Sequence, residues 1–309
     1  MRIGARARKV GTAGVFVLLI AALWVGLSLL PERSPEDRKQ IADLLDGAEA
    51  SEARGRLMEA QVTYRLALTM ADKAVDLKAQ IAAHIALARL AAAHERNAEA
   101  SAELANALDL ARRLNDAERT ATVLNNLGEV GRAQGELEEA RQFFQQALDL
   151  PGATEKTRAA ALNNLGEVAR AERRFPEALE FYRQSQALNE KLEYKAGLAA
   201  NLANIGAVHL SQGNPREAVQ WLQRGYRLAF ESGDRLALPP ILTTLGQAYV
   251  AAGDVQEGGL SLIEARDQYL LLGLEAKAGA LTREIQRLQE AAFAPQTGAQ
   301  APPASKHHR

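Results

Sequence analysis

Cysteine is absent from the 309-residue chain, and aromatic residues make up only 5% of it. The first absence excludes disulfides, thiolate metal sites, iron–sulfur clusters and cysteine nucleophiles. A net charge of −1 excludes a strongly basic protein, and the two ends of the chain carry six cations and no acidic residue. The body between the ends is therefore acidic and repels a phosphate backbone. We expect no nucleic-acid binding.

The sequence also lacks the motifs that carry most enzyme chemistry. It contains neither a glycine-rich phosphate loop nor a His-Glu-x-x-His zinc motif. Its histidines stand in no recognisable arrangement with an acid or a nucleophile. We therefore expect no catalytic residues, no metal site, no cofactor, no small-molecule substrate and no enzymatic activity.

One long apolar run lies near the N-terminus. Residues 1–9 are basic, and residues 10–30 carry no charge. A helix of this length spans about 31 Å, close to the thickness of a bilayer's hydrocarbon core. The run predicts an uncleaved transmembrane signal anchor, with a cleaved signal peptide as the alternative. The positive-inside rule then predicts a single-pass membrane protein with a cytoplasmic N-terminus and an extracytoplasmic body, which is periplasmic if the chain is bacterial.

The body of the chain repeats itself about every forty residues. The clearest copies read Val-Leu-Asn-Asn-Leu-Gly-Glu-Val from Val123 and Ala-Leu-Asn-Asn-Leu-Gly-Glu-Val from Ala161, and later copies place their glycine at Gly206 and Gly246. A small, a large and a second small residue follow each copy at fixed spacing: Ala140-Phe144-Ala147, Ala178-Tyr182-Ser185, Ala218-Leu222-Gly225 and Gly258-Leu262-Ala265. Weaker copies extend upstream, so six repeats begin near residues 41, 81, 121, 159, 199 and 239.

This pattern resembles the tetratricopeptide repeat, in a variety with a period of forty residues, which folds as two antiparallel helices. The resemblance implies an all-α, right-handed superhelical solenoid of about six helix pairs over residues 41–278. We place a linker at 31–40 and an amphipathic capping helix at 279–293. The composition of residues 294–309 is typical of a disordered tail.

Polar residues recur on the first helix of each pair, which lines the concave surface in tetratricopeptide-repeat proteins. A carboxamide both donates and accepts hydrogen bonds, and the resemblance implies that these asparagines grip the backbone of a peptide. The alternative is hydrogen bonding between repeats on a solvated face, with the Glu/Arg pairs supporting their own helix. The candidate contact residues are Asn125, Asn126, Glu129, Arg132, Asn163, Asn164, Glu167, Arg170, Asn201, Asn204, Thr243 and Thr244.

These features predict a membrane-anchored scaffold that binds a peptide segment or a partner protein in its concave groove. Architectural analogy suggests a role in envelope assembly or secretion. Family members that clamp a C-terminal carboxylate carry Lys and Arg where this chain has Thr122, Ala160 and Ala200, which disfavours that use. The alternative function is a self-associating structural subunit of a membrane complex, and thus a homo-oligomer.

Overall fold

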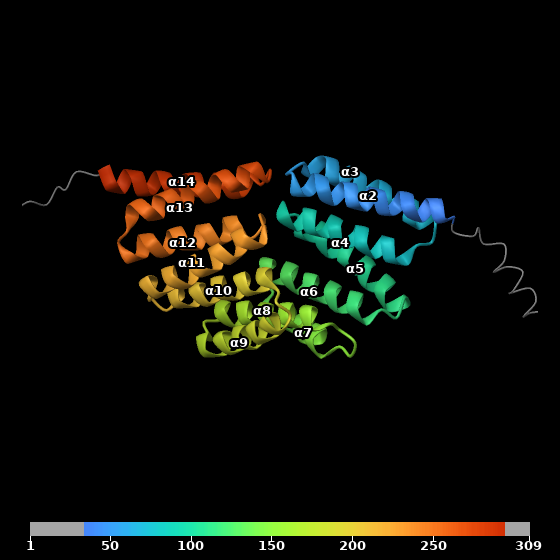
Figure 1. Ribbon diagram of the computed structural model, residues 1–309, viewed down its shortest axis with the longest axis horizontal. Helices are drawn as coiled ribbons and strands as arrows, with labels where there is room; N and C mark the ends of the chain where they lie inside the picture. The colour runs from blue at the N-terminus through green and yellow to red at the C-terminus, as the bar shows by residue number, and fades with distance from the viewer. Residues whose placement is uncertain (1–33, 294–309) are drawn as a thin grey trace, which may run out of the picture.

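The computed structural model describes residues 34–293, which form thirteen helices and no strand (Figure 1). Consecutive helices pack as antiparallel pairs, from α2 with α3 to α12 with α13, and α14 packs on the last pair. The fold is therefore an all-helical solenoid. The helices are α2 Pro35–Ala53, α3 Leu57–Lys73, α4 Leu77–Ala93, α5 Asn97–Arg113, α6 Ala117–Gln134, α7 Leu137–Asp149, α8 Glu155–Ala171, α9 Phe175–Lys191, α10 Lys195–Ser211, α11 Pro215–Ser232, α12 Leu238–Ala252, α13 Val255–Leu271 and α14 Glu275–Phe293.

Side-chain caps mark where several first helices begin. The side-chain oxygens of Asp76, Asp116 and Thr154 accept hydrogen bonds from backbone amides in the first turns of α4, α6 and α8. Each such bond satisfies an amide that the helix itself leaves unpaired. Ser34 caps α2 in the same way ahead of Pro35, a residue suited to a first helical turn. The segment predicted as a linker, 31–40, is consequently helical from Pro35 onward.

The two helices of a pair approach each other closely at the small residues that recur in each repeat. A Cβ atom added at Gly128 would lie 2.5 Å from the Phe144 ring, and one added at Gly166 would lie 2.5 Å from the Tyr182 ring. Phe144 and Tyr182 are fully buried there. The absence of a side chain on the first helix therefore makes the space that the large residue of the second helix fills.

The core continues from one pair to the next. The buried cluster around Tyr182 includes Ala169 and Ala178 of its own pair and also Ile205 and Val208 of α10. A single helix pair could not bury this surface, because one side of it faces the following pair. Stacking of neighbouring pairs thus completes the core.

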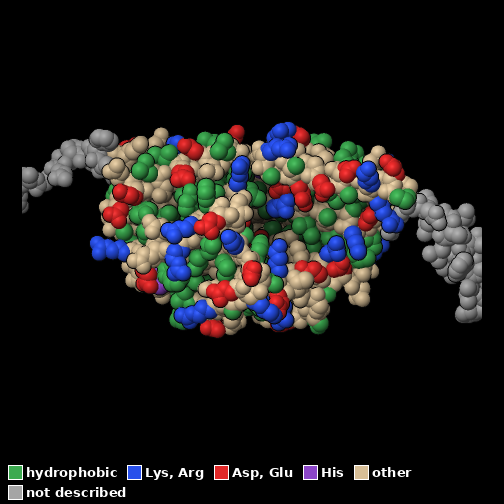
Figure 2. Space-filling model, viewed as in Figure 1, with side chains coloured by type: hydrophobic (Ala, Val, Ile, Leu, Met, Phe, Trp, Pro, Cys, Tyr) green, Lys and Arg blue, Asp and Glu red, His purple; other side chains and the backbone are tan. Residues whose placement is uncertain are grey.

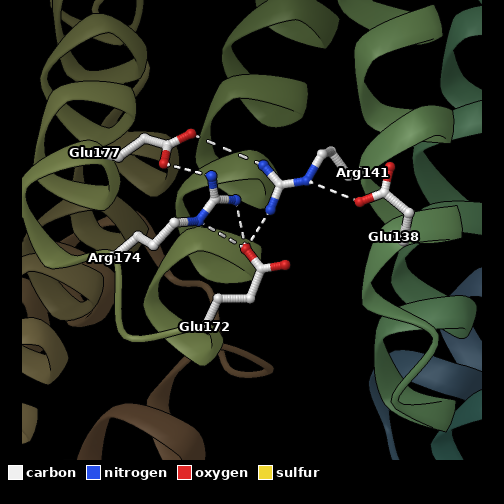
Figure 3. A network of polar contacts seen from close by, with 5 residues as sticks. All are labelled: Glu138, Arg141, Glu172, Arg174 and Glu177. Carbon is white, nitrogen blue, oxygen red and sulfur yellow. Dashed lines mark hydrogen bonds and ion pairs between the residues drawn. The ribbon is translucent and has the colours of Figure 1, made fainter.

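An ion-pair network joins consecutive pairs at the end of α8 (Figure 3). Arg141 of α7 reaches Glu172, which also pairs with Arg174 in the turn before α9. Glu177 lies 2.8 Å from Arg174 and 3.8 Å from Arg141, and Glu138 lies 3.6 Å from Arg141. Exposed pairs contribute at most about 1 kcal/mol each, so the network aligns the two pairs more than it stabilises them.

The two ends of the solenoid meet. Figure 1 shows the helix pairs following an arc that brings α13 and α14 back beside α2 and α3. At this point a Cβ atom on Gly55, in the turn after α2, would lie 2.3 Å from the carbonyl oxygen of Leu271 at the end of α13. Gly55 has φ of 75°, a backbone conformation that favours glycine. The contact between these two turns closes the arc around a central space.

The predicted localisation requires a correction. Within residues 34–293, no helix is both long enough and apolar enough to cross a membrane. The predicted anchor at 10–30, the basic segment at 1–9 and the tail at 294–309 lie outside the described residues. The structure therefore gives no support to a single-pass membrane protein.

The close approach at Gly166 predicts that two glycine-to-alanine substitutions change stability in opposite directions. Alanine favours a helix interior over glycine by up to about 1 kcal/mol, but overpacking a tight core costs about 1–3 kcal/mol. Gly166→Ala should therefore lower stability, whereas Gly47→Ala, whose new Cβ meets nothing within 4 Å, should raise it. Thermal unfolding of both variants measures the difference. A stabilised Gly166→Ala protein would contradict the packing described here.

Candidate functional site

A cavity of about 550 Å³ opens on the inner side of the arc, and we call it the central hollow. Figure 2 shows a hollow near the middle of this face with Lys and Arg side chains around it. Its apolar lining includes Ile85, Ala88, Ala92, Ala93, Leu104, Val130, Ala133 and Leu236. Its polar lining consists of Arg89, Asn126, Glu129, Arg132 and Lys277.

The lining comes from the N-terminal and the C-terminal halves of the chain. Most of it belongs to α4 and α6, but Leu236 lies in the turn before α12 and Lys277 lies in the first turn of α14. These segments are far apart in sequence and share a cavity because the arc closes. One molecule in the hollow would touch both halves of the solenoid.

The carboxylate of Glu52 holds the Arg89 side chain in place. Its Nε and Nη2 lie 2.9 Å and 2.6 Å from the two carboxylate oxygens of Glu52, and the buried hydroxyl of Tyr64 donates to the same carboxylate. The geometry is bidentate, which holds a guanidinium in one orientation. The remaining nitrogen, Nη1, makes no hydrogen bond to any residue of 34–293.

Asn164, Glu129, Arg132 and Glu167 form a polar chain between α6 and α8. Asn164 donates to Oε1 of Glu129 at 3.1 Å, and Nη2 of Arg132 lies 3.0 Å from Oε2 of Glu167. The acidic and basic residues therefore pair across repeats, and no ion pair joins Glu129 to Arg132 or Glu167 to Arg170 within the described residues. Nε of Arg132 is buried without a hydrogen-bond partner there.

Glu129 is open to the solvent of the hollow but is surrounded by protein. This enclosure raises the pKa of Glu129 above its ordinary value of 4.5, and nearby Glu167 adds to the effect. The hydrogen bond from Asn164 and the charge of Arg132 oppose the rise without cancelling it. The ionised carboxylate is thus less favourable in the folded chain than in the unfolded chain.

A second set of predicted asparagines joins α8, α9 and α10. Oδ1 of Asn163 accepts from Asn201 at 3.1 Å and from Asn204 at 3.0 Å. Asn201 is fully buried, and its own Oδ1 accepts from Asn189 at 2.8 Å. Asn204 also donates to Glu167. These carboxamides satisfy one another between repeats, as buried amides require.

Sequence reasoning missed Asn189, although a signal for it exists. Asn189 follows the small-large-small pattern of its repeat by four residues, where two earlier repeats have Ala71 and Ala111 and a later one has Ala229. An asparagine in a position that alanine usually fills, fully inside a helix pair, requires a polar partner. Asn201 is that partner.

The remaining predicted residues lie away from the central hollow. Asn125 is buried and donates to the backbone carbonyl of Thr157 at 3.2 Å. Thr243 and Thr244 each donate to a carbonyl one turn earlier in α12. Arg170 lies near the hydroxyl of Tyr182, whose pKa is raised by burial and, second, by the charge of Glu167. None of these four candidate residues lines the central hollow.

Asn126 differs from every other predicted asparagine. It is half-buried, lines the central hollow and makes no hydrogen bond to any part of the chain that the structure describes. Asn126, Glu129 and Arg132 are thus the only predicted residues in the lining of the hollow. Arg89 and Lys277 were missed; Arg89 stands one period before Glu129, but no local pattern marks Lys277.

Comparison with known families identifies repeats within this fold. The tetratricopeptide repeat matches residues 79–151 and 157–229, so the chain carries tetratricopeptide repeats over these two stretches. This confirms the repeat type inferred from the glycine and alanine spacing. No curated protein matches the sequence significantly.

Several solved structures share the fold. A Rap protein in complex with Competence and Sporulation Factor aligns with a TM-score of 0.59 at 14% identity, over 80% of this chain and 74% of that one. The Rap conjugation gene regulator of plasmid pLS20, in complex with a Phr peptide, gives a TM-score of 0.59 at 14% identity over 83% and 77%. Aspartyl phosphate phosphatase F from Bacillus subtilis gives 0.58 at 12% over 93% and 78%. At these identities the likeness is one of fold alone.

The raised pKa of Glu129 predicts that Glu129→Gln increases the stability of the protein by an amount that depends on pH. The variant keeps an acceptor for Asn164 but carries no charge, so it avoids the cost of an enclosed carboxylate. Since protonation removes that cost from the wild type, the gain should be largest near pH 7 and should disappear below about pH 4. Thermal unfolding between pH 3 and 8 measures it.

Glu167→Gln is the matched control, because it removes the charge that faces Arg132. This variant should be less stable than the wild type at pH 7. A gain from Glu129→Gln that does not change with pH would contradict the account of Glu129.

Proposed function

We propose that this protein is an interaction module that binds an extended peptide segment, free or as part of a partner protein, in the central hollow. The free carboxamide of Asn126 is the observation that carries the proposal. Every other asparagine on the predicted list has a hydrogen-bond partner in a neighbouring helix. An unpaired carboxamide beside an apolar wall is suited to a peptide backbone, which presents a donor and an acceptor at each residue.

The dimensions and chemistry of the hollow support a peptide. A volume of about 550 Å³ is within the usual range of ligand pockets. Aliphatic side chains of α4, α5 and α6 can bury apolar side chains of a segment, while Asn126 and the cations fix its direction. Two of the structures with the same fold are complexes, one with Competence and Sporulation Factor and one with a Phr peptide, and this supports a peptide ligand for a solenoid of this shape.

We further propose that the module binds without catalysing a reaction. Its strongest candidates for acid–base chemistry are engaged in structural contacts, since Glu52 holds Arg89 and Glu167 holds Arg132. Glu129 is directed to Asn164. A paired and oriented group is suited to positioning a ligand more than to exchanging protons with it.

A self-associating subunit is the second candidate function, and an exposed stripe on α3 favours it. Met58, Val62 and Leu66 are spaced four residues apart and are 74%, 65% and 50% exposed. Residues at this spacing share one helix face. A contiguous apolar face of this kind is typical of a protein contact.

Val62→Lys tests the second candidate. A charge in the middle of the stripe should dissociate an oligomer that uses it, because an unpaired lysine in an apolar interface is costly. Light scattering on the full-length wild type and variant over a range of concentrations measures the mass. Equal, concentration-independent masses for the two proteins would remove this candidate.

Asn126→Ala tests the peptide-binding function. The full-length protein is exposed to a randomised nonapeptide pool, and the captured peptides are quantified. Loss of two hydrogen bonds to a backbone should reduce capture about tenfold. The melting temperature should not change, because Asn126 bonds to no other described residue.

Two further asparagine variants complete this test. Asn106→Ala removes an exposed asparagine of α5 that has no hydrogen bond among the described residues, and it should leave both capture and melting unchanged. Asn164→Ala breaks the bond to Glu129 and should lower the melting temperature. If the Asn126→Ala and Asn106→Ala proteins capture equal amounts of peptide, the assignment of Asn126 as a peptide contact is wrong.

A further inference from the structure

The donors that line the central hollow outnumber its acceptors. Arg89, Arg132 and Lys277 contribute three cations, while Glu129 is the one carboxylate in the lining. Glu129 already accepts a hydrogen bond from Asn164 through Oε1. Three of the four charged side chains that line the hollow are therefore cations, and two of these, Arg89 and Arg132, pair with carboxylates outside the lining.

Two arginine nitrogens have no partner in the described part of the chain after the internal contacts are made, and one of them, Nε of Arg132, is buried. Nη1 of Arg89 and Nε of Arg132 have no hydrogen-bond partner among the described residues. The carboxylates that pair with the two arginines, Glu52 and Glu167, are held behind them and do not line the cavity. The paired carboxylates thus orient the guanidinium groups without using up their donors.

Lys277 completes the site from the opposite end of the solenoid. Its Nζ lies 5.8 Å from the centre of the Tyr269 ring, and it forms no ion pair within residues 34–293. The position is exposed, so its charge is not needed for the fold. A lysine held near an aromatic ring beside a cavity can pair with an incoming anion at little cost in reorganisation.

The apolar lining indicates which kind of molecule would carry an anionic group into the hollow. Ile85, Leu104, Val130 and Leu236 surround the same cavity as the cations. A small inorganic anion would leave this surface in contact with water. A side-chain carboxylate flanked by apolar residues matches both parts of the lining.

We propose that the central hollow selects a peptide segment by an acidic side chain, Asp or Glu, which Arg89, Arg132 and Lys277 receive between helices α4 and α6 and helix α14. This inference rests on the proposed function and specifies its ligand. The apolar neighbours of the acidic residue pack on α4 and α6. Because Lys277 and Leu236 belong to the C-terminal half of the chain, the bound segment contacts both halves of the solenoid.

A pool of nonapeptides with one fixed central residue tests this proposal. The central residue is Glu, Gln or Lys, the flanking positions are randomised, and both termini are blocked by acetylation and amidation, so that only side chains carry charge. The full-length protein should retain the Glu pool about tenfold more strongly than the Gln pool. The Lys pool should be retained least.

Variants at Lys277 assign the selection to the hollow. Lys277→Gln should reduce the preference for Glu over Gln at least threefold, and Lys277→Glu should shift the preference toward the Lys pool. Lys73→Gln, at an exposed lysine of α3, should have the preference of the wild type. Lys277 is exposed, so these variants should fold, and their melting temperatures check this.

Three outcomes overturn the proposal, and they are distinguishable. Equal retention of the Glu and Gln pools refutes the acidic side chain but leaves peptide binding in place. Selection that appears only with peptides carrying a free C-terminal carboxylate assigns the site to a chain end instead of a side chain. Retention of none of the pools refutes the proposed function together with its ligand.

Discussion

The turn between α2 and α3 lies against the turn between α13 and α14, and the central hollow depends on this contact. Without it, Leu236 and Lys277 would move away from α4 and α6, and the cavity would lose one of its walls. The contact is close because Gly55 has no side chain at the point where its backbone meets Leu271. Gly273, at the other side of the contact, also has a positive φ. Two glycine turns thus decide whether the inner surface is an open groove or an enclosed site.

The polar residues of the inner surface perform two different tasks. Most of the asparagines bond between repeats, where a buried carboxamide is costly unless it is paired. Such bonds are satisfied in one alignment of neighbouring helices and not in others, so they fix the register of the stack. Asn126 and Nη1 of Arg89 have no such partner among the described residues. The surface that remains free for a ligand is therefore much smaller than the polar surface that the repeats present.

The local structure follows from the sequence because it depends on residues close together in the chain. The spacing of Gly128 from Ala140 and Phe144 predicts a helix pair, and the repetition of that spacing predicts stacking of one pair on the next. The comparison with known families confirms the repeat type over residues 79–151 and 157–229. The sequence analysis assigned residues 31–40 to a linker and so did not predict that α2 begins at Pro35. Ser34 as the cap and Pro35 in the first turn are a local signal for this helix start.

The site is less predictable because it depends on curvature. The small rotation between successive pairs accumulates along the solenoid, and no local pattern encodes where the last pair arrives. The pairing of Arg132 with Glu167, in place of a pair within one helix, follows from that rotation. Lys277 lies in the hollow because the rotations between successive pairs add up along the whole solenoid. The localisation required correction for a different reason, since it rested on residues 10–30, outside the described part of the chain.

The distance between the two ends of the solenoid tests the central claim most directly. The chain has no cysteine, so Arg54→Cys with Gln268→Cys provides the only two sites for spin labels. Both residues line a cavity of about 530 Å³ where the ends meet. The closed arc predicts one narrow population of short distances in dipolar spectroscopy of the full-length protein. A broad distribution at long distances would contradict closure, and with it the enclosed hollow.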